Sequence, residues 1–364
     1  MNKINKMTNQ KSKKIALVAG GTGGHIFPAI SLGEWIVKHD PNASVIFFCG
    51  NRQLEGNIYC SHGITPIVLP VKGSPFSGSL KQKIARTVNI VRAFFNAFAY
   101  LREESPDFIL FFGGYISFPV YLAAKLRSLP VAIHEQNACA GKVTRFLAKF
   151  NELIFTGFKA CWPLDSGKTV YTGIPIREFN LLPKNMAMEE LGLSCKISSN
   201  SKIVLVLTGS LGSETIKTKL LSLVSGGNFS DVQFVMPATS EKVEKVRHNI
   251  WLLPRVWKAE LLFSIADAII ARAGGSSLAE IGALKIPAII IPWKDAKDNH
   301  QYYNAREFVQ EHSALLLDED DVQGKLEIML NQVLYDTNWM SSHTKQDNAS
   351  FKIYNKMLSM VNEQ

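Results

Sequence analysis

The chain lacks the cysteine patterns that stabilise secreted domains or bind zinc. Its five cysteines are scattered over 364 residues without a C-x-x-C pair or a zinc-type Cys/His spacing, and an odd number cannot pair completely in disulfides. We therefore expect a protein of a reducing compartment that has neither a disulfide framework nor a zinc site.

We expect neither a signal peptide nor a membrane-spanning segment. Residues 1–13 form a lysine-rich arm with no acid and no apolar core, which we interpret as disordered rather than as a leader. The longest apolar run, Phe108 to Ala124, is interrupted by Gly113, Gly114 and Pro119, so it is a poor membrane span. The sequence predicts a soluble or peripheral protein.

Little positive charge remains outside the basic arm. The formal net charge is +9, and the lysines up to Lys14 supply five of these units, which leaves about four for the rest of the chain. No RNP, zinc-finger or helix-turn-helix signature accompanies this modest excess. We therefore expect no nucleic-acid partner.

The length and composition predict two α/β domains. Short β-branched runs alternate with helical stretches, which is typical of parallel sheets covered by helices, and the length exceeds that of one compact core. The expected strands are Lys14–Ala19, Ser44–Cys49, Asp107–Phe112, Val131–His134, Lys202–Thr208, Val232–Met236, Ala268–Ala271 and Ala288–Ile291. Because the first strand of each half runs into a glycine-rich turn, we interpret the halves as twin Rossmann-like domains, although this pairing is common enough to be a coincidence.

The first glycine-rich turn, Gly20-Gly21-Thr22-Gly23-Gly24-His25, precedes a helical stretch. Backbone N–H groups at such a helix start can hold phosphate. The turn completes neither the G-x-G-x-x-G fingerprint nor the P-loop, which argues against NAD and against nucleoside-triphosphate hydrolysis. His25 is its one titratable side chain. At a helix start the ring is favoured in its neutral form, as a general base or as a structural histidine.

Two further turns have the same character, Phe112–Tyr115 and Thr208–Ser213. Each has a simpler interpretation as a tight strand-to-helix turn, but three of them favour a diphosphate-rich reaction. Another strand ends in His134-Glu135-Gln136-Asn137, at the sheet edge where α/β proteins bind ligands. There Asn137 is the better ligand contact, and His134 with Glu135 alternatively forms a structural hydrogen-bonded pair.

In the second half, Ala271–Glu280 passes from a strand through small residues into a helix, and we expect Glu280 in its first turn. A carboxylate there can accept both hydroxyls of a ribose, or it can simply be an acid stabilised by the helix dipole. Asp318-Glu319-Asp320 formally matches a D-x-D metal motif. Because a helical run follows it, an N-cap with solvated acids explains it, and we predict no active-site metal.

Residues 71–102 combine bulky apolar with basic side chains. The residues concerned are Phe76, Leu80, Ile84, Val91, Phe94, Phe95 and Phe98, with Lys72, Lys81, Lys83, Arg86, Arg92 and Arg102. This combination suits a helix that lies on an anionic bilayer. An ordinary half-buried helix is the alternative.

Four segments in this order, Gly20–His25 with Phe27-Pro28, Gly113–Tyr115, His134–Asn137 and Gly274–Glu280, resemble the MurG family over nearly the whole chain. The resemblance implies a GT-B fold, with two parallel sheets facing across a cleft. It implies inverting transfer of N-acetylglucosamine from UDP-GlcNAc to the C4 hydroxyl of undecaprenyl-diphospho-N-acetylmuramoyl-pentapeptide (lipid I), giving lipid II for peptidoglycan, with no cofactor. It also implies a cytoplasmic enzyme, peripheral on the inner face of the plasma membrane through 71–102.

The resemblance further implies an acceptor-binding domain over 14–176, a UDP-GlcNAc-binding domain over 177–340, and a C-terminal helix over 341–364 that packs back toward the first domain. The positions matching the family's donor contacts are Thr22, Gly23, Gly24, Asn137, Arg177, Ser210, Val256, Gly275, Ser276, Ser277, Leu278, Ala279, Glu280 and Gln301. His25 matches a histidine important for catalysis. We expect the acceptor diphosphate at Gly20, Gly21, Gly113, Gly114 and Tyr115.

By the same resemblance, Arg177 and the helix starts offset charge on the departing UDP, Glu280 holds the ribose and Gln301 reaches the sugar hydroxyls. Leu211 and Ala273 replace a glutamine and a serine that are common in the family, and we expect activity to survive both changes. Two alternatives remain. One is another GT-B UDP-sugar enzyme, an epimerase or a lipid glycosyltransferase, and the other is a non-catalytic UDP-sugar-binding membrane scaffold subunit.

Overall fold

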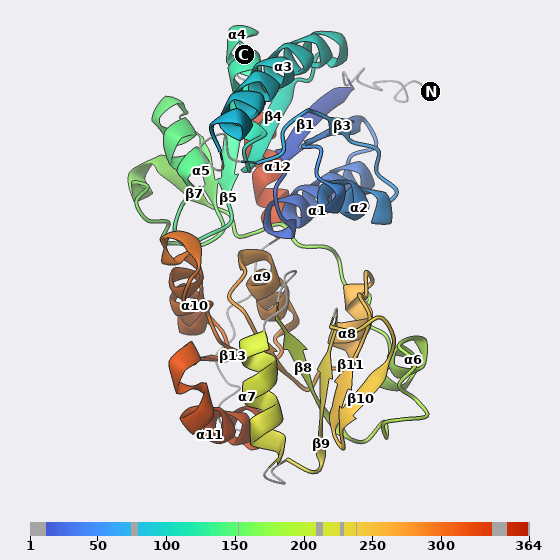
Figure 1. Cartoon of the computed structure of the whole chain (residues 1–364). Helices are drawn as coiled ribbons and strands as arrows, with labels where there is room; N and C mark the ends of the chain where they lie inside the picture. The colour runs from blue at the N-terminus through green and yellow to red at the C-terminus, as the bar shows by residue number, and fades with distance from the viewer. Residues whose placement is uncertain are drawn as a thin grey trace, which may run out of the picture.

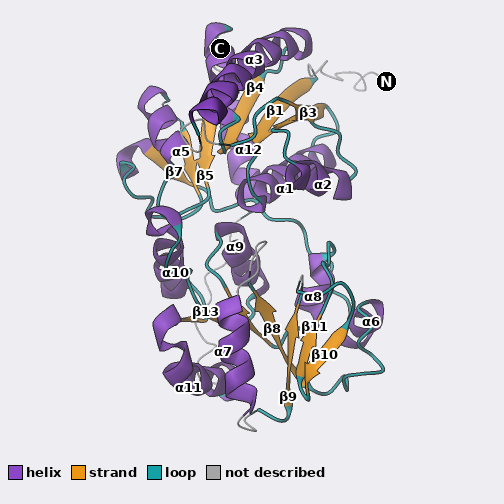
Figure 2. Cartoon of the chain, viewed as in Figure 1, coloured by secondary structure: helices purple, strands orange, loops and turns teal. Residues whose placement is uncertain are grey.

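The protein consists of two α/β lobes, each built mainly from one half of the chain (Figure 1). The computed structural model describes residues 12–73, 79–151, 153–208, 214–225, 229–237, 239–336 and 348–362. In each lobe helices surround one central sheet (Figure 2). The two-domain GT-B-like α/β fold expected from the sequence is thus confirmed.

The first lobe is built on a seven-stranded parallel sheet in the order β3-β2-β1-β4-β5-β6-β7. Its strands are β1 (Lys13–Ala19), β2 (Ala43–Cys49), β3 (Ile67–Val68), β4 (Phe108–Gly113), β5 (Val131–Glu135), β6 (Ile154–Thr156) and β7 (Thr169–Tyr171). Its helices are α1 (Gly23–His39), α2 (Gln53–Ser61), α3 (Leu80–Glu104), α4 (Ser117–Leu126) and α5 (Lys142–Leu147).

The central strand β1 is apolar on both faces because helices cover both sides of the sheet. Ile15 and Leu17 pack into a core shared with α1, whereas Ala16 and Val18 pack into a core shared with α3 and α4. The pairing of β1 with β4 shifts register after Val18, directly before the first glycine-rich turn. Such a bulge re-aims the chain where the strand ends.

The second lobe repeats this plan with the order β10-β11-β9-β8-β12-β13-β14. All neighbours are parallel except the pair β10 and β11, an antiparallel edge that the sequence did not reveal. Its strands are β8 (Lys202–Leu207), β9 (Val232–Met236), β10 (Glu244–Arg247), β11 (Ile250–Leu252), β12 (Ala268–Ala271), β13 (Ala288–Ile290) and β14 (Ala314–Leu316). Its helices are α6 (Lys184–Glu190), α7 (Glu214–Ser225), α8 (Ala259–Ile265), α9 (Gly275–Leu284), α10 (His300–Glu311) and α11 (Val322–Tyr335).

The last helix, α12 (Ala349–Asn362), lies in the first lobe, against α1 (Figure 1). The Trp35 ring contacts the rings of Phe351 and Tyr354 edge-on, with centroids 6.2 and 6.0 Å away. The Tyr354 hydroxyl donates to Asp40 at 2.5 Å. These contacts, together with Ile353 in the core of the first lobe, fasten the C-terminal helix to the N-terminal half.

Candidate functional site

Three segments singled out in the sequence meet at one edge of the first sheet. Strand β1 leads into residues 20–25, β4 ends at Gly113 and leads into Gly114, and β5 leads into Gln136. From β1 the chain adds β2 and β3 on one side of the sheet, and then β4 to β7 on the other side. The order of the strands therefore reverses between β1 and β4, although the strands stay parallel. Open α/β sheets bind their ligands at such a reversal, outside the carboxyl ends of the strands.

The turn after β4 can be formed only by glycine. Gly113 and Gly114 have φ values of +112° and +84°, a region that side chains disfavour. A Cβ on Gly114 would lie 2.4 Å from the carbonyl oxygen of Gly20, and one on Gly113 would lie 3.0 Å from Cε1 of His25. The His25 ring therefore lies directly on Gly113. The next residue, Tyr115, is half-buried against the first-lobe core.

A buried carboxylate occupies part of the first glycine-rich turn. Glu55 on α2 accepts from the N–H of Gly21 at 3.0 Å and of Gly50 at 2.7 Å. Burial raises the pKa of Glu55, and the two N–H groups oppose that rise. Because its N–H is taken, Gly21 cannot offer it to a diphosphate as expected, and the first turn of α1 remains for that role.

His25 stands at the end of a hydrogen-bonded chain of side chains. Its Nδ1 lies 2.7 Å from Oε1 of Gln136. Nε2 of Gln136 lies 2.8 Å from the carbonyl oxygen of His134 and 3.0 Å from Nδ1 of the same residue. On its other side, Nε2 of His134 lies 2.9 Å from the carbonyl oxygen of Gly173. The sequence did not single out Gln136 for any role.

The suggested pairing of His134 with Glu135 is wrong, because Glu135 hydrogen-bonds elsewhere. Its Oε1 accepts from the backbone N–H and the side-chain amide of Asn137, at 3.1 and 2.9 Å. Its Oε2 accepts from the N–H of Gly141 at 3.1 Å. Residues adjacent in a strand point to opposite faces of the sheet, which separates His134 from Glu135.

Asn304 on α10 links this edge to the second lobe, and the sequence did not reveal it. It is fully buried, its Oδ1 accepts from the N–H of Ala138 at 2.7 Å, and its amide donates to Oδ1 of Asn137 and to the carbonyl of Ala273, each at 3.0 Å. The Asn137 amide is thus held between Glu135 and Asn304. In the sequence, the sign of this role was an asparagine that lies next to the apolar residues Ala305 and Phe308 in a helical stretch.

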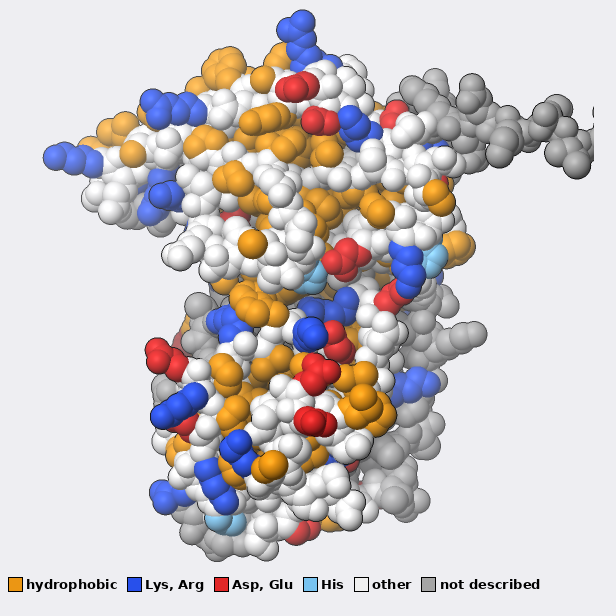
Figure 3. Space-filling view, turned by 90° about the vertical axis from the view of Figure 1, so that its right-hand side faces the viewer, with side chains coloured by type: hydrophobic (Ala, Val, Ile, Leu, Met, Phe, Trp, Pro, Cys, Tyr) orange, Lys and Arg blue, Asp and Glu red, His pale blue; other side chains and the backbone are white. Residues whose placement is uncertain are grey.

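The start of α9 in the second lobe touches the start of α1 in the first. The Ser276 hydroxyl donates to the carbonyl of Gly24 at 3.2 Å. A Cβ on Gly275 would lie only 2.4 Å from the carbonyl oxygen of Gln136. The lobes meet at a narrow waist (Figure 3), and two helix N-termini without acids in their first turns come together beside His25.

Arg177 and Glu280, both predicted to contact the donor, form an ion pair with each other. Nε of Arg177 lies 2.9 Å from Oε1 of Glu280, and the two side chains are only 16% and 12% exposed. The guanidinium also lies 5.2 Å from the centre of the Phe27 ring. Burial raises the pKa of Glu280, and Arg177 opposes that rise. In this structure the two side chains satisfy each other.

One expectation about Glu280 is wrong. Helix α9 begins at Gly275 and has no acid in its first turn, so Glu280 lies in the second turn. The helix dipole acts mainly within the first turn. Stabilisation by the dipole therefore does not explain this carboxylate, and its partner is Arg177.

The remaining candidate donor contacts differ in what they can offer a ligand. Leu278 and Ala279 are buried, Leu278 in the core of the second lobe, so only their backbone is available. Thr22, Gly23 and Gly24 form the N-terminus of α1. Ser277 lies in the first turn of α9, and Val256 follows β11, half-buried against the core. Ser210 lies outside the described residues.

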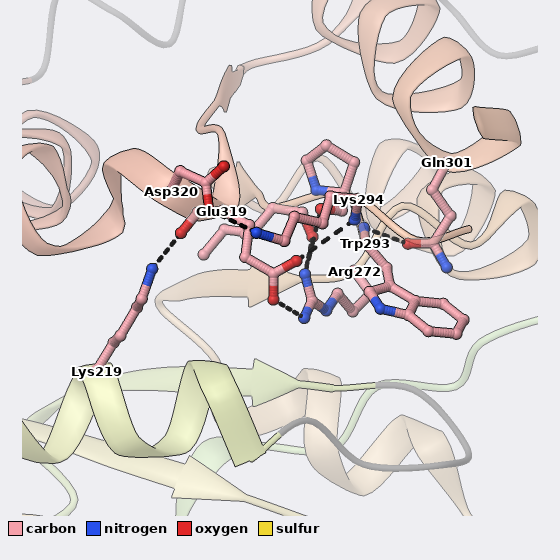
Figure 4. A network of polar contacts seen from close by, with 9 residues as sticks. Lys219, Arg272, Trp293, Lys294, Gln301, Glu319 and Asp320 are labelled. Carbon is pink, nitrogen blue, oxygen red and sulfur yellow. Dashed lines mark hydrogen bonds and ion pairs between the residues drawn. The ribbon is translucent and has the colours of Figure 1, made fainter.

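Gln301 belongs to a polar network in the second lobe (Figure 4). Its Oε1 accepts from the N–H of Trp293 at 3.0 Å. Beside it, buried Arg272 pairs with buried Glu319 at 2.6 Å and donates to the carbonyls of Ile291 and Pro292, each at 3.2 Å. The pair thus fixes the end of β13 and the loop after it. The Trp293 N–H of this loop in turn holds the side chain of Gln301 on α10.

The acids of the D-x-D motif are not simply solvated, as the sequence suggested. Glu319 is buried and paired with Arg272, and Asp320 pairs with Lys294 at 2.8 Å. Burial alone would raise the pKa of Glu319. The hydrogen bonds and charges of Arg272 and Lys294 outweigh burial and bring this pKa below its usual range. Asp318 stands at the N-cap position, but its side chain accepts no cap hydrogen bond. Among the described residues no group of His, Cys, Asp and Glu side chains could hold a metal.

Two doubly wound lobes with their loops meeting across a waist define a GT-B-type protein. Residues 15–156 match the glycosyltransferase family 28 N-terminal domain, and residues 203–357 match the glycosyltransferase family 28 C-terminal domain. The chain therefore belongs to glycosyltransferase family 28, which makes it an enzyme of the glycosyltransferase class.

Curated relatives carry a more specific name. A protein of Halalkalibacterium halodurans is 34% identical over 326 residues, which is 85% of this chain and 87% of the relative. One of Carboxydothermus hydrogenoformans is 31% identical over 316 residues, 84% of each chain. Both are named UDP-N-acetylglucosamine--N-acetylmuramyl-(pentapeptide) pyrophosphoryl-undecaprenol N-acetylglucosamine transferase.

Solved structures share the fold over nearly the whole chain. MurG of Acinetobacter baumannii aligns with a TM-score of 0.68 at 22% identity, covering 96% of this chain and 100% of that one. The UDP-GlcNAc 2-epimerase of Neisseria meningitidis aligns with a TM-score of 0.63 at 17% identity, covering 95% and 100%. Likeness at these identities establishes the fold and leaves the reaction open.

Proposed function

We propose that this protein transfers N-acetylglucosamine from UDP-GlcNAc to the C4 hydroxyl of an undecaprenyl-diphospho-N-acetylmuramoyl-pentapeptide, with inversion at the anomeric carbon. The relatives named for this reaction match both lobes at 31–34% identity. The observation that carries the chemistry is the meeting of the α1 and α9 N-termini beside His25. Helix N-termini favour phosphate, and the leaving group is a nucleoside diphosphate.

The site residues divide the work as follows. His25 takes the proton from the C4 hydroxyl as that oxygen attacks the anomeric carbon. The first-turn N–H groups of α1 and α9 stabilise the negative charge that gathers on UDP. The ribose hydroxyls replace Arg177 as partners of Glu280, which frees the guanidinium for the diphosphate. The Gln301 amide, oriented by Trp293, reaches the sugar hydroxyls.

The lipid-linked acceptor requires a membrane surface, and we propose that α3 provides it. Leu80, Ile84, Val88, Val91 and Phe95 recur at helical spacing, and each is at least 45% exposed. Exposed Lys81, Lys83 and Arg92 accompany this apolar stripe. Apolar and basic side chains together bind an anionic bilayer surface. No described helix is long and apolar enough to cross a bilayer, and we place the protein at the cytoplasmic face of the plasma membrane.

The opposite face of α3 has a structural role. Ala93, Ala97 and Leu101 are fully buried in the core shared with α4. The alternative of an ordinary half-buried helix describes this face, and the proposed membrane contact concerns only the exposed face. Phe76 lies outside the described residues.

The direct test supplies radiolabelled UDP-GlcNAc with and without the muramoyl-pentapeptide lipid. We expect label in the lipid product only when both substrates are present, and the same rate with a chelator added. Isomerised donor or UDP release without acceptor would instead identify an epimerase, the activity of the similar structure from Neisseria meningitidis. Loss of transfer under chelation would overturn the prediction of metal-independent chemistry.

Two substitutions separate an enzyme from a non-catalytic scaffold subunit. His25→Ala should lower kcat by about 100- to 10,000-fold, the range for a lost general base. Glu280→Ala should raise KM for UDP-GlcNAc by about 10- to 100-fold, as expected for a lost charged hydrogen bond. Ile328→Ala, at an exposed position on α11, is the control. Normal turnover in both site variants would contradict the assigned roles.

A further inference from the structure

The hydrogen-bonded chain that ends at His25 has fixed proton positions. A carbonyl oxygen only accepts hydrogen bonds. Because Nε2 of Gln136 lies 2.8 Å from the carbonyl oxygen of His134, the amide NH₂ must face that carbonyl. The other amide atom, Oε1, therefore faces His25.

The contacts of His134, at the other end of this series of hydrogen bonds, require the same orientation of the Gln136 amide. Nε2 of His134 lies 2.9 Å from the carbonyl oxygen of Gly173, so Nε2 carries a proton and donates. His134 is fully buried, and burial lowers its pKa to about 4, so the ring is neutral near pH 7. Its Nδ1 is then an acceptor, and it takes the second amide proton of Gln136 at 3.0 Å.

We propose that Gln136 and His134 are positioning residues that hold neutral His25 in the tautomer with its proton on Nδ1 and its lone pair on Nε2. Oε1 of Gln136 can only accept, so Nδ1 of His25, 2.7 Å away, must donate. Among the described residues nothing hydrogen-bonds to Nε2 of His25, whose ring is half-buried where the lobes meet. This inference rests on the proposed transferase function.

The tautomer decides whether His25 can act as a base. With Nε2 unprotonated, it accepts the proton of the C4 hydroxyl while the oxygen bonds to the anomeric carbon of the donor. The bond from that carbon to the UDP oxygen breaks, and its electron pair leaves with the diphosphate. The imidazolium keeps its bond to Oε1 of Gln136 and later releases the acquired proton to solvent. In the other tautomer Nε2 carries a hydrogen and cannot accept a proton.

Nitrogen-15 NMR of histidine side chains reads the tautomer directly, without substrates. At about pH 8 the full-length protein should show His25 with a protonated Nδ1 and an unprotonated Nε2, assigned by the signals that vanish in His25→Ala. Gln136→Met removes the acceptor, and the Nε2–H tautomer that free histidine favours should then predominate. A protonated Nε2 in the wild type, or an unchanged tautomer in Gln136→Met, overturns the proposal.

Kinetics provide the second measurement. Gln136→Met should lower kcat about 100-fold with KM for both substrates nearly unchanged, because only the transition state uses the base. Gln136→Glu retains an acceptor toward His25, so it should keep the tautomer and recover about tenfold of that loss. His134→Phe retains the ring stacking on Phe112 and one of the two contacts that orient Gln136, so its kcat should fall by only about tenfold.

A matched control is Gln233→Met, which removes the Gln233 acceptor of Trp251 in the second lobe and should alter neither tautomer nor kcat. Wild-type kcat in Gln136→Met overturns the proposal even if the tautomer changes. The His25→Ala assay then distinguishes the two levels of failure. If that variant is inactive, the transferase function with a His25 base stands and only the positioning role fails.

Discussion

His134 shows how one buried side chain can make stability depend on pH. Burial lowers its pKa from 6.5 to about 4. Above pH 6.5 the ring is neutral in the folded and unfolded chain alike, and its contribution is fully present. As the pH falls from 6.5 toward 4, the unfolded chain binds a proton that the folded state excludes, so the free energy of unfolding decreases.

This loss should be about 2 kcal/mol between about pH 7.5 and about pH 5. His134→Phe removes the titrating group and retains the packing on Phe112. Urea unfolding of both proteins at the two pH values measures the difference. The variant should lose about 2 kcal/mol less than the wild type on acidification; equal losses in both proteins would contradict the buried neutral state of His134.

At the same scale, the sequence singled out residues but not their partners. His25 and Glu280 stand out because their segments carry glycines and small residues. Gln136 and Asn304 do not, because their role comes from contacts that close only when distant segments meet, such as Asn304 with Asn137 and Ala273. The same reason explains why Arg177 and Glu280 were given separate roles although they pair.

At the scale of elements, strong apolar runs were sufficient. Every one of the eight strands expected from the sequence occurs within one residue of its expected ends. The strands that the sequence did not reveal, among them β3, β6, β7 and β10, have two to four residues, too few to show a pattern. The sequence predicted the start of α9 too late. Gly274 and Gly275 have a low propensity for helix, and contacts with the first lobe stabilise the helix start there.

Helix α3 exposes an apolar stripe that can be altered without changing its buried face. Ile84→Ser combined with Phe95→Ser removes two exposed side chains from the apolar stripe, while the buried Ala93, Ala97 and Leu101 keep the helix in place. Binding to vesicles that contain anionic phospholipid should weaken at least about tenfold, since each buried apolar side chain contributes roughly 1–2 kcal/mol. Transfer to a short-chain, water-soluble acceptor should be unaffected.

Sedimentation with vesicles measures this binding. Ile328→Ser is the matched control, because Ile328 is 68% exposed on α11 in the other lobe. Wild-type binding should also weaken as salt rises, because the lysines and Arg92 of α3 act through screened charge. Equal binding by the double variant and the control would exclude α3 as the membrane-docking surface.

In the whole molecule, the proposed site lies where the two lobes meet. His25, Gln136 and Asn137 come from the first lobe, whereas Ser276, Glu280 and Asn304 come from the second, and hydrogen bonds join the two sets. Helix α12 returns to the first lobe and packs on α1, the helix that starts at the glycine-rich turn. The repeated pattern in the sequence predicted the two lobes. It did not predict the contacts that fix the position of one lobe relative to the other.

The structure of the reaction product tests the proposed transfer to the C4 hydroxyl most directly. The lipid-linked disaccharide made from UDP-GlcNAc and the muramoyl-pentapeptide lipid can be analysed by proton and carbon NMR. Inverting transfer to the C4 hydroxyl should give a β-configured anomeric proton on N-acetylglucosamine that correlates with C4 of the muramoyl ring. An α linkage, attachment at another hydroxyl, or isomerised donor in place of a disaccharide would contradict it.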